Sequence, residues 1–238
     1  MRLFIISMLL MSSVVVRADD AVLRNVDIFE LEYAADPQVS PDGSSVAYVR
    51  TSMDIMSDRA VANIWQVDAD GDNHRPLLSG PEDYSSPRWS PGGDRLAYVT
   101  RVPRRGAQLH VRWMDTGQTA VVSNVRRTPN AISWSPGGEY LAFVMLVPDE
   151  NEPLAKPPAA PDGADWAPGA KVIESMPYRF DGAGYLETGR DHVFVVSAEG
   201  GTPRQLTGGN FDHRGPLAWT PDGERIIFSA NRLEDAEH

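Results

Sequence analysis

The sequence predicts an all-β protein built from a repeated four-stranded unit, and three observations carry this prediction. A short phrase with a Ser-Pro turn between two apolar stretches occurs four times. A second phrase, typical of a β-hairpin, occurs three times. The two phrases alternate along the chain, and recurring short strands joined by tight turns are typical of a repeated all-β architecture.

The first phrase contains a turn with a defined conformational requirement. Proline sets φ near −65° at the second turn position, and the glycine at the end of the turn accepts a positive φ at little cost. That glycine is present in every copy, as Gly43, Gly93, Gly138 and Gly223. The four copies read "PQVSPDGSSVAYVR" (37–50), "PRWSPGGDRLAYVT" (87–100), "ISWSPGGEYLAFVM" (132–145) and "LAWTPDGERIIFSA" (217–230).

The stretch after each turn is apolar at consecutive positions, so we expect strands that are covered on both faces. The second phrase then adds a strand, a glycine-bearing turn and another strand. Its copies are "IWQVDADGDNHRPLLSG" from Ile64, "LHVRWMDTGQTAVVSN" from Leu109 and "VFVVSAEGGTPRQLTGG" from Val193. Two strands from each phrase make one four-stranded blade, which predicts a β-propeller.

The spacing of the turns predicts where this propeller is interrupted. The turns start at Ser40, Ser90, Ser135 and Thr220, so the third interval is much longer than the first two. We place an insertion in the third blade at about residues 146–190, as a Pro-rich surface loop followed by "VIESMPYRFDGAGYL", which can form a small docked hairpin. The fourth hairpin is expected near residue 240. The sequence therefore predicts an incomplete propeller, with about three blades plus part of a fourth, at the front of a longer protein.

The first residues resemble an export signal. Arg2 precedes an apolar run from Leu3 to Val16, which is short for a membrane span, and Val16-Arg17-Ala18 fits a signal peptidase site. We expect a signal peptide over 1–18 and the partial propeller over 19–238, in a periplasmic or secreted protein that leaves the membrane after cleavage. The alternative is an uncleaved anchor. The chain has no cysteine, which excludes a disulfide and a lipoprotein anchor.

Composition and motifs limit the chemistry. A formal net charge of −11 argues against nucleic acid and anionic lipid as partners. The sequence has no Gly-x-Ser-x-Gly, no His-Glu-x-x-His and no phosphate-binding loop. We therefore expect no catalytic, metal-binding or cofactor-binding residue and no cofactor.

Four features have a functional and a structural interpretation, and the structural one is favoured for each. The calcium-loop-like "DADGDN" (68–73) aligns with a hairpin turn, and "RVPRRG" (101–106) fits a solvated loop. Asp191 and His192 could form a catalytic dyad but have no nucleophile, so we interpret them as a pair at a strand end on the surface. Tryptophans at 89, 134 and 219 hold a fixed place in the repeat, which favours packing between blades over a sugar platform.

The opening "DIFELEYAADPQVSPDGSSVAYVR", the order of the later phrases and the insertion ending in "YRFDGAGYL" resemble the prolyl oligopeptidase family. The acylaminoacyl-peptidase and dipeptidyl-peptidase-like members are the most similar. The resemblance implies a propeller that limits the access of peptides to a C-terminal α/β-hydrolase domain with Ser, Asp and His. That domain is absent here, so no catalytic residue carries over, and whether this chain is an enzyme stays open.

A second hypothesis is a non-enzymatic periplasmic propeller similar to TolB, which would bind an envelope protein. It shares the Ser-Pro-Asp-Gly repeat and the export signal, but the insertion and the opening segment argue against it. A sugar-active propeller is a third alternative. In each case the unpaired strand edges of an open propeller could bind a partner.

Overall fold

The computed structural model describes residues 23–80, 82–102, 106–149, 158–167, 173, 178–181 and 184–233. The expected signal peptide, 1–18, lies outside this range. Apart from one short 3₁₀ helix, η1 (Asn25–Glu30), every regular element described is a β-strand. No described helix has the length and apolarity needed to cross a membrane.

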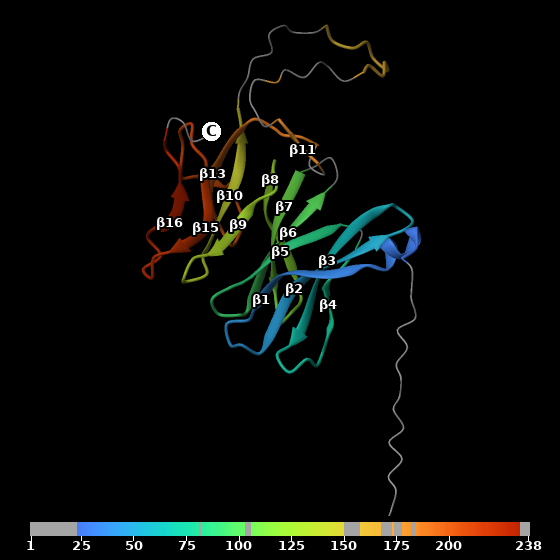
Figure 1. Ribbon diagram of the computed structural model, residues 1–238. Coiled ribbons are helices and arrows are strands. Elements are labelled where there is room, and N and C mark those ends of the chain that lie inside the picture. The colour runs from blue at the N-terminus through green and yellow to red at the C-terminus, as the bar shows by residue number, and fades with distance from the viewer. Residues whose placement is uncertain are drawn as a thin grey trace, which may run out of the picture.

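Three four-stranded antiparallel sheets form blades 1 to 3 (Figure 1). Blade 1 contains β1 (Glu32–Val39), β2 (Ser45–Asp54), β3 (Arg59–Asp68) and β4 (Arg75–Leu78). Blade 2 contains β5 (Asp83–Trp89), β6 (Arg95–Val102), β7 (Gly106–Trp113) and β8 (Thr119–Val125). Blade 3 contains β9 (Asn130–Trp134), β10 (Tyr140–Pro148), β13 (Gly189–Ser197) and β14 (Arg204–Gln205).

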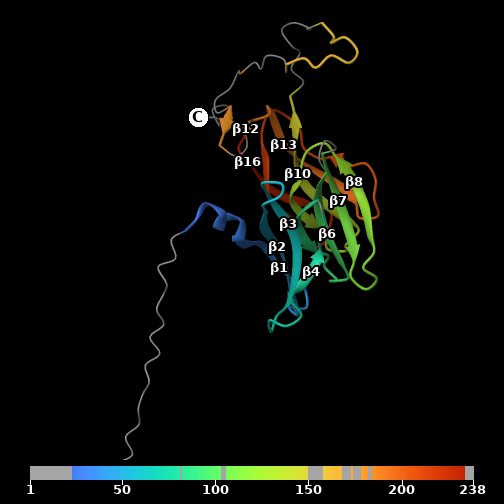
Figure 2. The ribbon, with the colours of Figure 1, turned by 90° about the vertical axis from the view of Figure 1, so that its right-hand side faces the viewer.

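Two further antiparallel pairs complete the described strands. β15 (His213–Trp219) pairs with β16 (Ile226–Ala230) as the first half of blade 4. β11 (Arg179–Phe180) pairs with β12 (Gly184–Tyr185) inside the segment that joins β10 to β13, and residues 158–167 of that segment lie apart from the blades (Figures 1 and 2). The predicted fold class is confirmed: the described chain is all-β, with three four-stranded blades and part of a fourth.

The Ser-Pro turns adopt the predicted conformation. Their final glycines have φ of +73°, +73°, +78° and +72° at Gly43, Gly93, Gly138 and Gly223. The turns of successive blades also contact one another. A methyl group added to Gly93 would lie 3.4 Å from Cδ of Pro41 in the preceding turn, and one added to Gly223 would lie 3.7 Å from Cδ of Pro136. The turns of neighbouring blades therefore lie side by side at one end of the propeller.

The hydroxyl that opens each turn has a role that the sequence analysis missed. Ser40, Ser90, Ser135 and Thr220 each accept a hydrogen bond from the backbone N–H five residues later, at 3.0–3.1 Å. Ser40 also donates to the carboxylate of Asp42, and this contact, with others from Ser44, lowers the pKa of Asp42 to about 2. The recurrence of Ser or Thr at this position in all four copies is the signal that could have revealed the role.

Each blade packs on the next through the second strands. The face turned toward the following blade, here called the trailing face, carries small side chains; the face turned toward the preceding blade, the leading face, carries larger ones. The trailing pairs are Ala47 and Val49, Ala97 and Val99, and Ala142 and Val144. The leading pairs that cover them are Leu96 and Tyr98, Leu141 and Phe143, and Ile226 and Phe228.

Coverage on both faces, as predicted, holds for the second strands of blades 2 and 3, where Leu96, Val99 and Phe143 are fully buried. Burial also raises the pKa of Tyr98 to about 12. Blade 1 differs, because Val46 and Tyr48 on its leading face stay half-exposed. The expectation of coverage on both faces was therefore wrong for β2, because no described blade precedes it. It was also wrong for β16, where Ile227 is 62% exposed because no described blade follows it.

Candidate functional site: the inner strands

The first strands of the blades line the inner side of the propeller. β1, β5, β9 and β15 contact one another in that order. Asp36, Ser86 and Ala131, three residues before the end of β1, β5 and β9, have positive φ of 48°, 55° and 49°. The pairing register shifts around Asp36 and Ser86, which marks a β-bulge in both strands. Such bulges redirect side chains next to binding sites.

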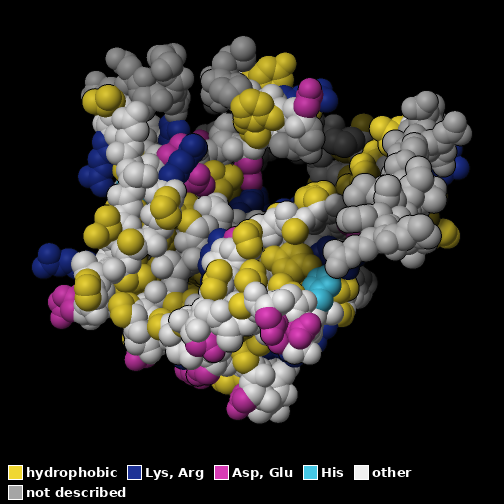
Figure 3. Space-filling view, turned by 60° about the horizontal axis from the view of Figure 1, so that its bottom comes forward, with side chains coloured by type: hydrophobic (Ala, Val, Ile, Leu, Met, Phe, Trp, Pro, Cys, Tyr) yellow, Lys and Arg dark blue, Asp and Glu magenta, His cyan; other side chains and the backbone are white. Residues whose placement is uncertain are grey.

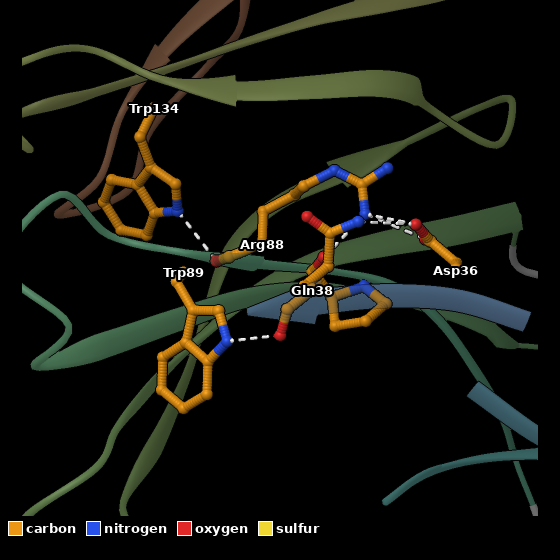
Figure 4. Close-up of polar contacts among 6 residues, drawn as sticks. Asp36, Gln38, Arg88, Trp89 and Trp134 are labelled. Carbon is orange, nitrogen blue, oxygen red and sulfur yellow. Dashed lines mark hydrogen bonds and ion pairs between the residues drawn. The ribbon is translucent and has the colours of Figure 1, made fainter. Parts of the chain in front are cut away.

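A chain of tryptophan hydrogen bonds joins consecutive inner strands. Nε1 of Trp89 donates to the carbonyl of Gln38 at 3.0 Å, and Nε1 of Trp134 donates to the carbonyl of Arg88 at 2.9 Å (Figure 4). Nε1 of Trp219 donates to the carbonyl of Ser133 at 3.3 Å. In each case the acceptor directly precedes the residue that holds the tryptophan position in the preceding blade; in blade 1 that position is Val39. The prediction that these tryptophans pack between blades is confirmed.

An ion pair crosses the first of these junctions. Nη1 of Arg88 lies 2.8 Å from Oδ2 and 2.9 Å from Oδ1 of Asp36, and the Gln38 amide donates to Oδ1 of Asp36 at 2.9 Å (Figure 4). The side chains of Asp36 and Arg88 are 29% and 26% exposed, so solvent still reaches both. The pair can therefore fix blade 1 against blade 2 and still present polar groups on the inner side. Neither residue was predicted from the sequence as a site residue.

A second polar group lies between blades 3 and 4. The rings of His192 and His213 have centroids 5.1 Å apart, and the two residues are 5% and 1% exposed. His192 and Asp191 both lie inside β13, so the interpretation of these residues as a surface pair at a strand end was wrong. The physical reason is that β10 and β13 pair along their whole length, from Tyr140–Ser197 to Pro148–Gly189, which extends β13 beyond the repeat phrase.

Burial and nearby charges shift the pKa values of residues at this histidine pair. Burial and the nearby carboxylate of Asp212 raise the pKa of Asp191, while burial and His213 lower the pKa of His192. Arg214 lies 2.9 Å from Asp212 and 3.5 Å from Asp191. Nδ1 of His192 lies 3.2 Å from Oγ1 of Thr207. Because His192 is buried, this hydroxyl–imidazole contact is closed to a substrate.

The remaining sequence candidates behave as structural elements. In "DADGDN" the Asn73 amide donates to Asp68 at 2.6 Å and the Gly71 N–H donates to the Asp68 carbonyl at 2.9 Å, as expected for the turn between β3 and β4. In "RVPRRG", Val102 pairs with Gly106 at the ends of β6 and β7, and 103–105 lie outside the described residues. Within the described part of the chain, no group of three or more His, Asp or Glu side chains could hold a metal ion.

The segment between β10 and β13 is attached to blade 2 as well as to blade 3. Arg127, which follows β8, makes a bidentate ion pair with Glu187. This contact lowers the pKa of Glu187 and raises that of Arg127. At the base of the β11–β12 hairpin, the Leu186 N–H donates to the carbonyl of Tyr178 at 2.9 Å. The base of the hairpin is therefore held by a backbone hydrogen bond, and its strands carry the half-exposed rings of Phe180 and Tyr185.

The surface carries no single dominant charge on the face shown in Figure 3, where acidic and basic side chains alternate with apolar ones. The inner strands add polar groups, among them the Asp36–Arg88 pair, on the inner side of the blades. Thr100 and Thr207 each contact a histidine, but Thr100 is buried, and so is His192, the partner of Thr207. A more exposed contact of this kind joins the Tyr48 hydroxyl to Nε2 of His74 at 2.6 Å. The inner strands present polar groups that can bind or restrict a partner.

Comparison with known proteins agrees with this description. Residues 46–153 match the family model of the TolB β-propeller domain. The chain is 27% identical over 208 residues, 87% of its length, to the uncharacterized peptidase YuxL of Bacillus subtilis. It is 25% identical over 211 residues to dipeptidyl-peptidase 5 of Porphyromonas endodontalis. The chain spans 31% and 29% of these two relatives. A shorter match, 35% identical over 68 residues, relates it to the Tol-Pal system protein TolB of Albidiferax ferrireducens.

Solved structures share the fold. The acylaminoacyl peptidase of Pyrococcus horikoshii superposes with a TM-score of 0.63 at 19% identity, covering 88% of this chain and 30% of that one. An oligogalacturonate lyase reaches a TM-score of 0.51 at 16% identity, covering 82% of this chain and 44% of that one, so the fold alone does not decide the activity. Taken with the sequence relatives, these matches confirm that the chain resembles the propeller part of prolyl oligopeptidase-type peptidases.

Proposed function

We propose that this chain is the non-catalytic propeller portion of an exported serine peptidase, where it restricts the access of peptides to a hydrolase domain. The length of the peptidase alignments carries the proposal. The Ser-Pro-Asp-Gly repeat is common to several propeller families and accounts for matches of one or two blades, such as the 68 residues shared with TolB. The peptidase matches extend over 208 and 211 residues, which is far more than the repeat phrase requires.

The geometry of the inner strands suits a gate. A propeller that restricts access must keep its blades in fixed relative positions when a peptide binds. Here each blade is tied to the preceding one by a tryptophan hydrogen bond, and the first junction also has the Asp36–Arg88 pair. The polar inner side and the half-exposed hairpin rings would meet a peptide before the hydrolase does. Export follows from the expected signal peptide at 1–18, and the destination would be the periplasm or the medium.

The test uses the protein expressed from its native gene and the 238-residue chain side by side. We expect the native product to hydrolyse chromogenic dipeptide or acyl-peptide anilides and to be inactivated by a serine-directed phosphonate. The 238-residue chain should be inactive with the same substrates. The proposal would be refuted by a native product that folds but is not labelled by the phosphonate and cleaves none of the peptides.

One specific observation favours a second function. The family model that matches residues 46–153 is that of the TolB propeller, and the TolB relatives belong to the Tol-Pal system. Under this alternative the chain would bind an envelope protein and need no hydrolase. Capture of an envelope lipoprotein by the purified chain, lost when Arg88 is replaced by glutamate but kept with Trp166→Phe in the exposed insertion, would support it.

A further inference from the structure

The residue before the tryptophan position carries a polar side chain in three consecutive blades. It is Gln38 in blade 1, Arg88 in blade 2 and Ser133 in blade 3, and all three residues are only partly buried. These are also the residues whose carbonyl groups accept the indole hydrogen bonds of the following blade. The neighbouring blade therefore fixes the backbone from which each of these side chains extends.

The Arg88 guanidinium is held through one of its three nitrogens. Nη1 makes both contacts with Asp36 and donates a third hydrogen bond, of 2.6 Å, to the carbonyl of Pro87 (Figure 4). Within the described chain, no hydrogen bond uses Nε or Nη2 of Arg88. Neither nitrogen is fully buried, so solvent reaches both. Arg88 thus has a fixed position and an open edge with two parallel N–H donors.

The Gln38 side chain offers the complementary group. Its amide nitrogen donates to Oδ1 of Asp36 at 2.9 Å, and its oxygen has no partner among the described residues. Because the carboxylate of Asp36 binds both side chains, it holds Gln38 and Arg88 next to each other across two inner strands. Two donors on Arg88 and an acceptor on Gln38 are the groups that can pair with the C=O and N–H of a peptide backbone.

The charge balance decides between a peptide group and a carboxylate as the ligand. Asp36 already neutralises Arg88, so the pair has no net charge. The chain as a whole has a formal net charge of −11, which disfavours an anionic ligand further. A neutral acceptor such as a peptide carbonyl needs only the open donors of the guanidinium. The arrangement therefore favours the main chain of a peptide.

We propose that Arg88 and Gln38, both held by Asp36, bind the main chain of a peptide on the inner side of the propeller. Nε and Nη2 of Arg88 would donate to a peptide carbonyl, and Oε1 of Gln38 would accept from a peptide N–H. The inference rests on the proposed function, from which it takes the peptide as ligand. It adds that recognition at this point uses the backbone and does not depend on the sequence of the peptide.

The test follows the indole N–H signals of the isotopically labelled 238-residue chain by nuclear magnetic resonance. The chain has six tryptophans, and single Trp→Phe variants assign their signals. The probe is a hexapeptide of alternating alanine and serine, blocked at both ends so that it carries no charge. We expect saturable shifts for Trp89 and Trp134, whose indoles bind the carbonyls of Gln38 and Arg88, and none for Trp166 in the insertion.

Arg88→Lys separates peptide binding from the ion pair, because a lysine can still pair with Asp36 but has no second edge. We expect this variant to raise the dissociation constant of the peptide about tenfold, as for the loss of two hydrogen bonds. Gln38→Met keeps the size of the side chain and should raise the constant about threefold. The matched control is Arg127→Lys, the same change in an ion-paired arginine outside the inner strands, which should leave the constant unchanged.

The inference would be overturned if Trp89 and Trp134 showed no saturable shift, or if the dissociation constant were the same in the unchanged chain and in both inner-strand variants. It would also be overturned if succinate produced these shifts and the blocked peptide did not, because the site would then bind carboxylates. Peptidase activity of the native gene product is measured separately. An inactive native product together with Arg88-dependent peptide binding would refute the proposed function and leave the binding site standing. An active product with unchanged peptide binding in the variants would do the reverse.

Discussion

Replacement of Trp134 by phenylalanine tests the tryptophan chain most sharply. Trp134 is 8% exposed, belongs to the core between blades 2 and 3, and donates to the Arg88 carbonyl at 2.9 Å. Phenylalanine keeps a ring but loses the donor, which costs about 1 kcal/mol of unfolding free energy. The smaller ring removes apolar contacts worth about 1 kcal/mol more. We therefore expect Trp134→Phe to lower the free energy of unfolding by about 2 kcal/mol.

The assay is urea unfolding of the full chain, followed by far-ultraviolet circular dichroism. With a slope of about 2 kcal/mol per molar urea, the midpoint should fall by about 1 M. Trp166→Phe is the control, because Trp166 lies in the insertion with 51% exposure and should shift the midpoint little. A midpoint for Trp134→Phe that equals the control would refute the view that these indoles hold the blades together.

Three further predictions follow from single contacts. Gly106→Ala should cost about 2 kcal/mol, from its φ of +87° and a Cβ that would lie 2.7 Å from the carbonyl oxygen of Val125, whereas Gly43→Ala, whose Cβ would have nothing within 4 Å, should cost about 1 kcal/mol in the same urea assay; equal costs would contradict this. Burial lowers the pKa of His110 and of His192, so near the ordinary histidine pKa the unfolded chain binds more protons than the folded one. The free energy of unfolding should therefore decrease as the pH falls from about 7.5 to about 5.5. Replacing both histidines by glutamine should make this decrease smaller, and an unchanged decrease would show that these two histidines do not cause it. Arg127→Ala removes a half-exposed ion pair, so global stability should change by less than about 1 kcal/mol while trypsin cleavage within 149–188 accelerates; an unchanged cleavage rate would show that Glu187 does not anchor the insertion.

Much of the fold could be predicted because it depends on residues that are close together in the sequence. A turn that needs a positive φ at Gly93 and Gly138, and apolar residues on both faces of the strand that follows, leave few alternatives to a stacked blade. The tryptophans were predictable for the same reason, since their fixed distance from the turn places them at every junction. The spacing of the turns also indicated that the chain between β10 and β13 is longer than in the other blades.

The inner-strand contacts could not be predicted from a single sequence. Asp36 and Arg88 are 52 residues apart, and their pairing depends on a bulge that gives Asp36 a φ of +48°. Nothing in the local pattern of "AADPQV" distinguishes that bulge from a regular strand. The burial of His192 depends in the same way on the extended pairing of β13 with β10, which lies across the insertion. Contacts of this kind are set by the arrangement of blades, which the repeat implies but does not specify.

The central claim is that this chain is the propeller part of a larger serine peptidase, and one measurement tests it most directly. The DNA that follows the codon for His238 is sequenced in the native gene. We expect an open frame that continues with a hairpin near residue 240, further blades and later a Gly-x-Ser-x-Gly motif. A stop codon directly after His238, in a gene whose product is stably folded, would contradict it and favour the TolB-like alternative.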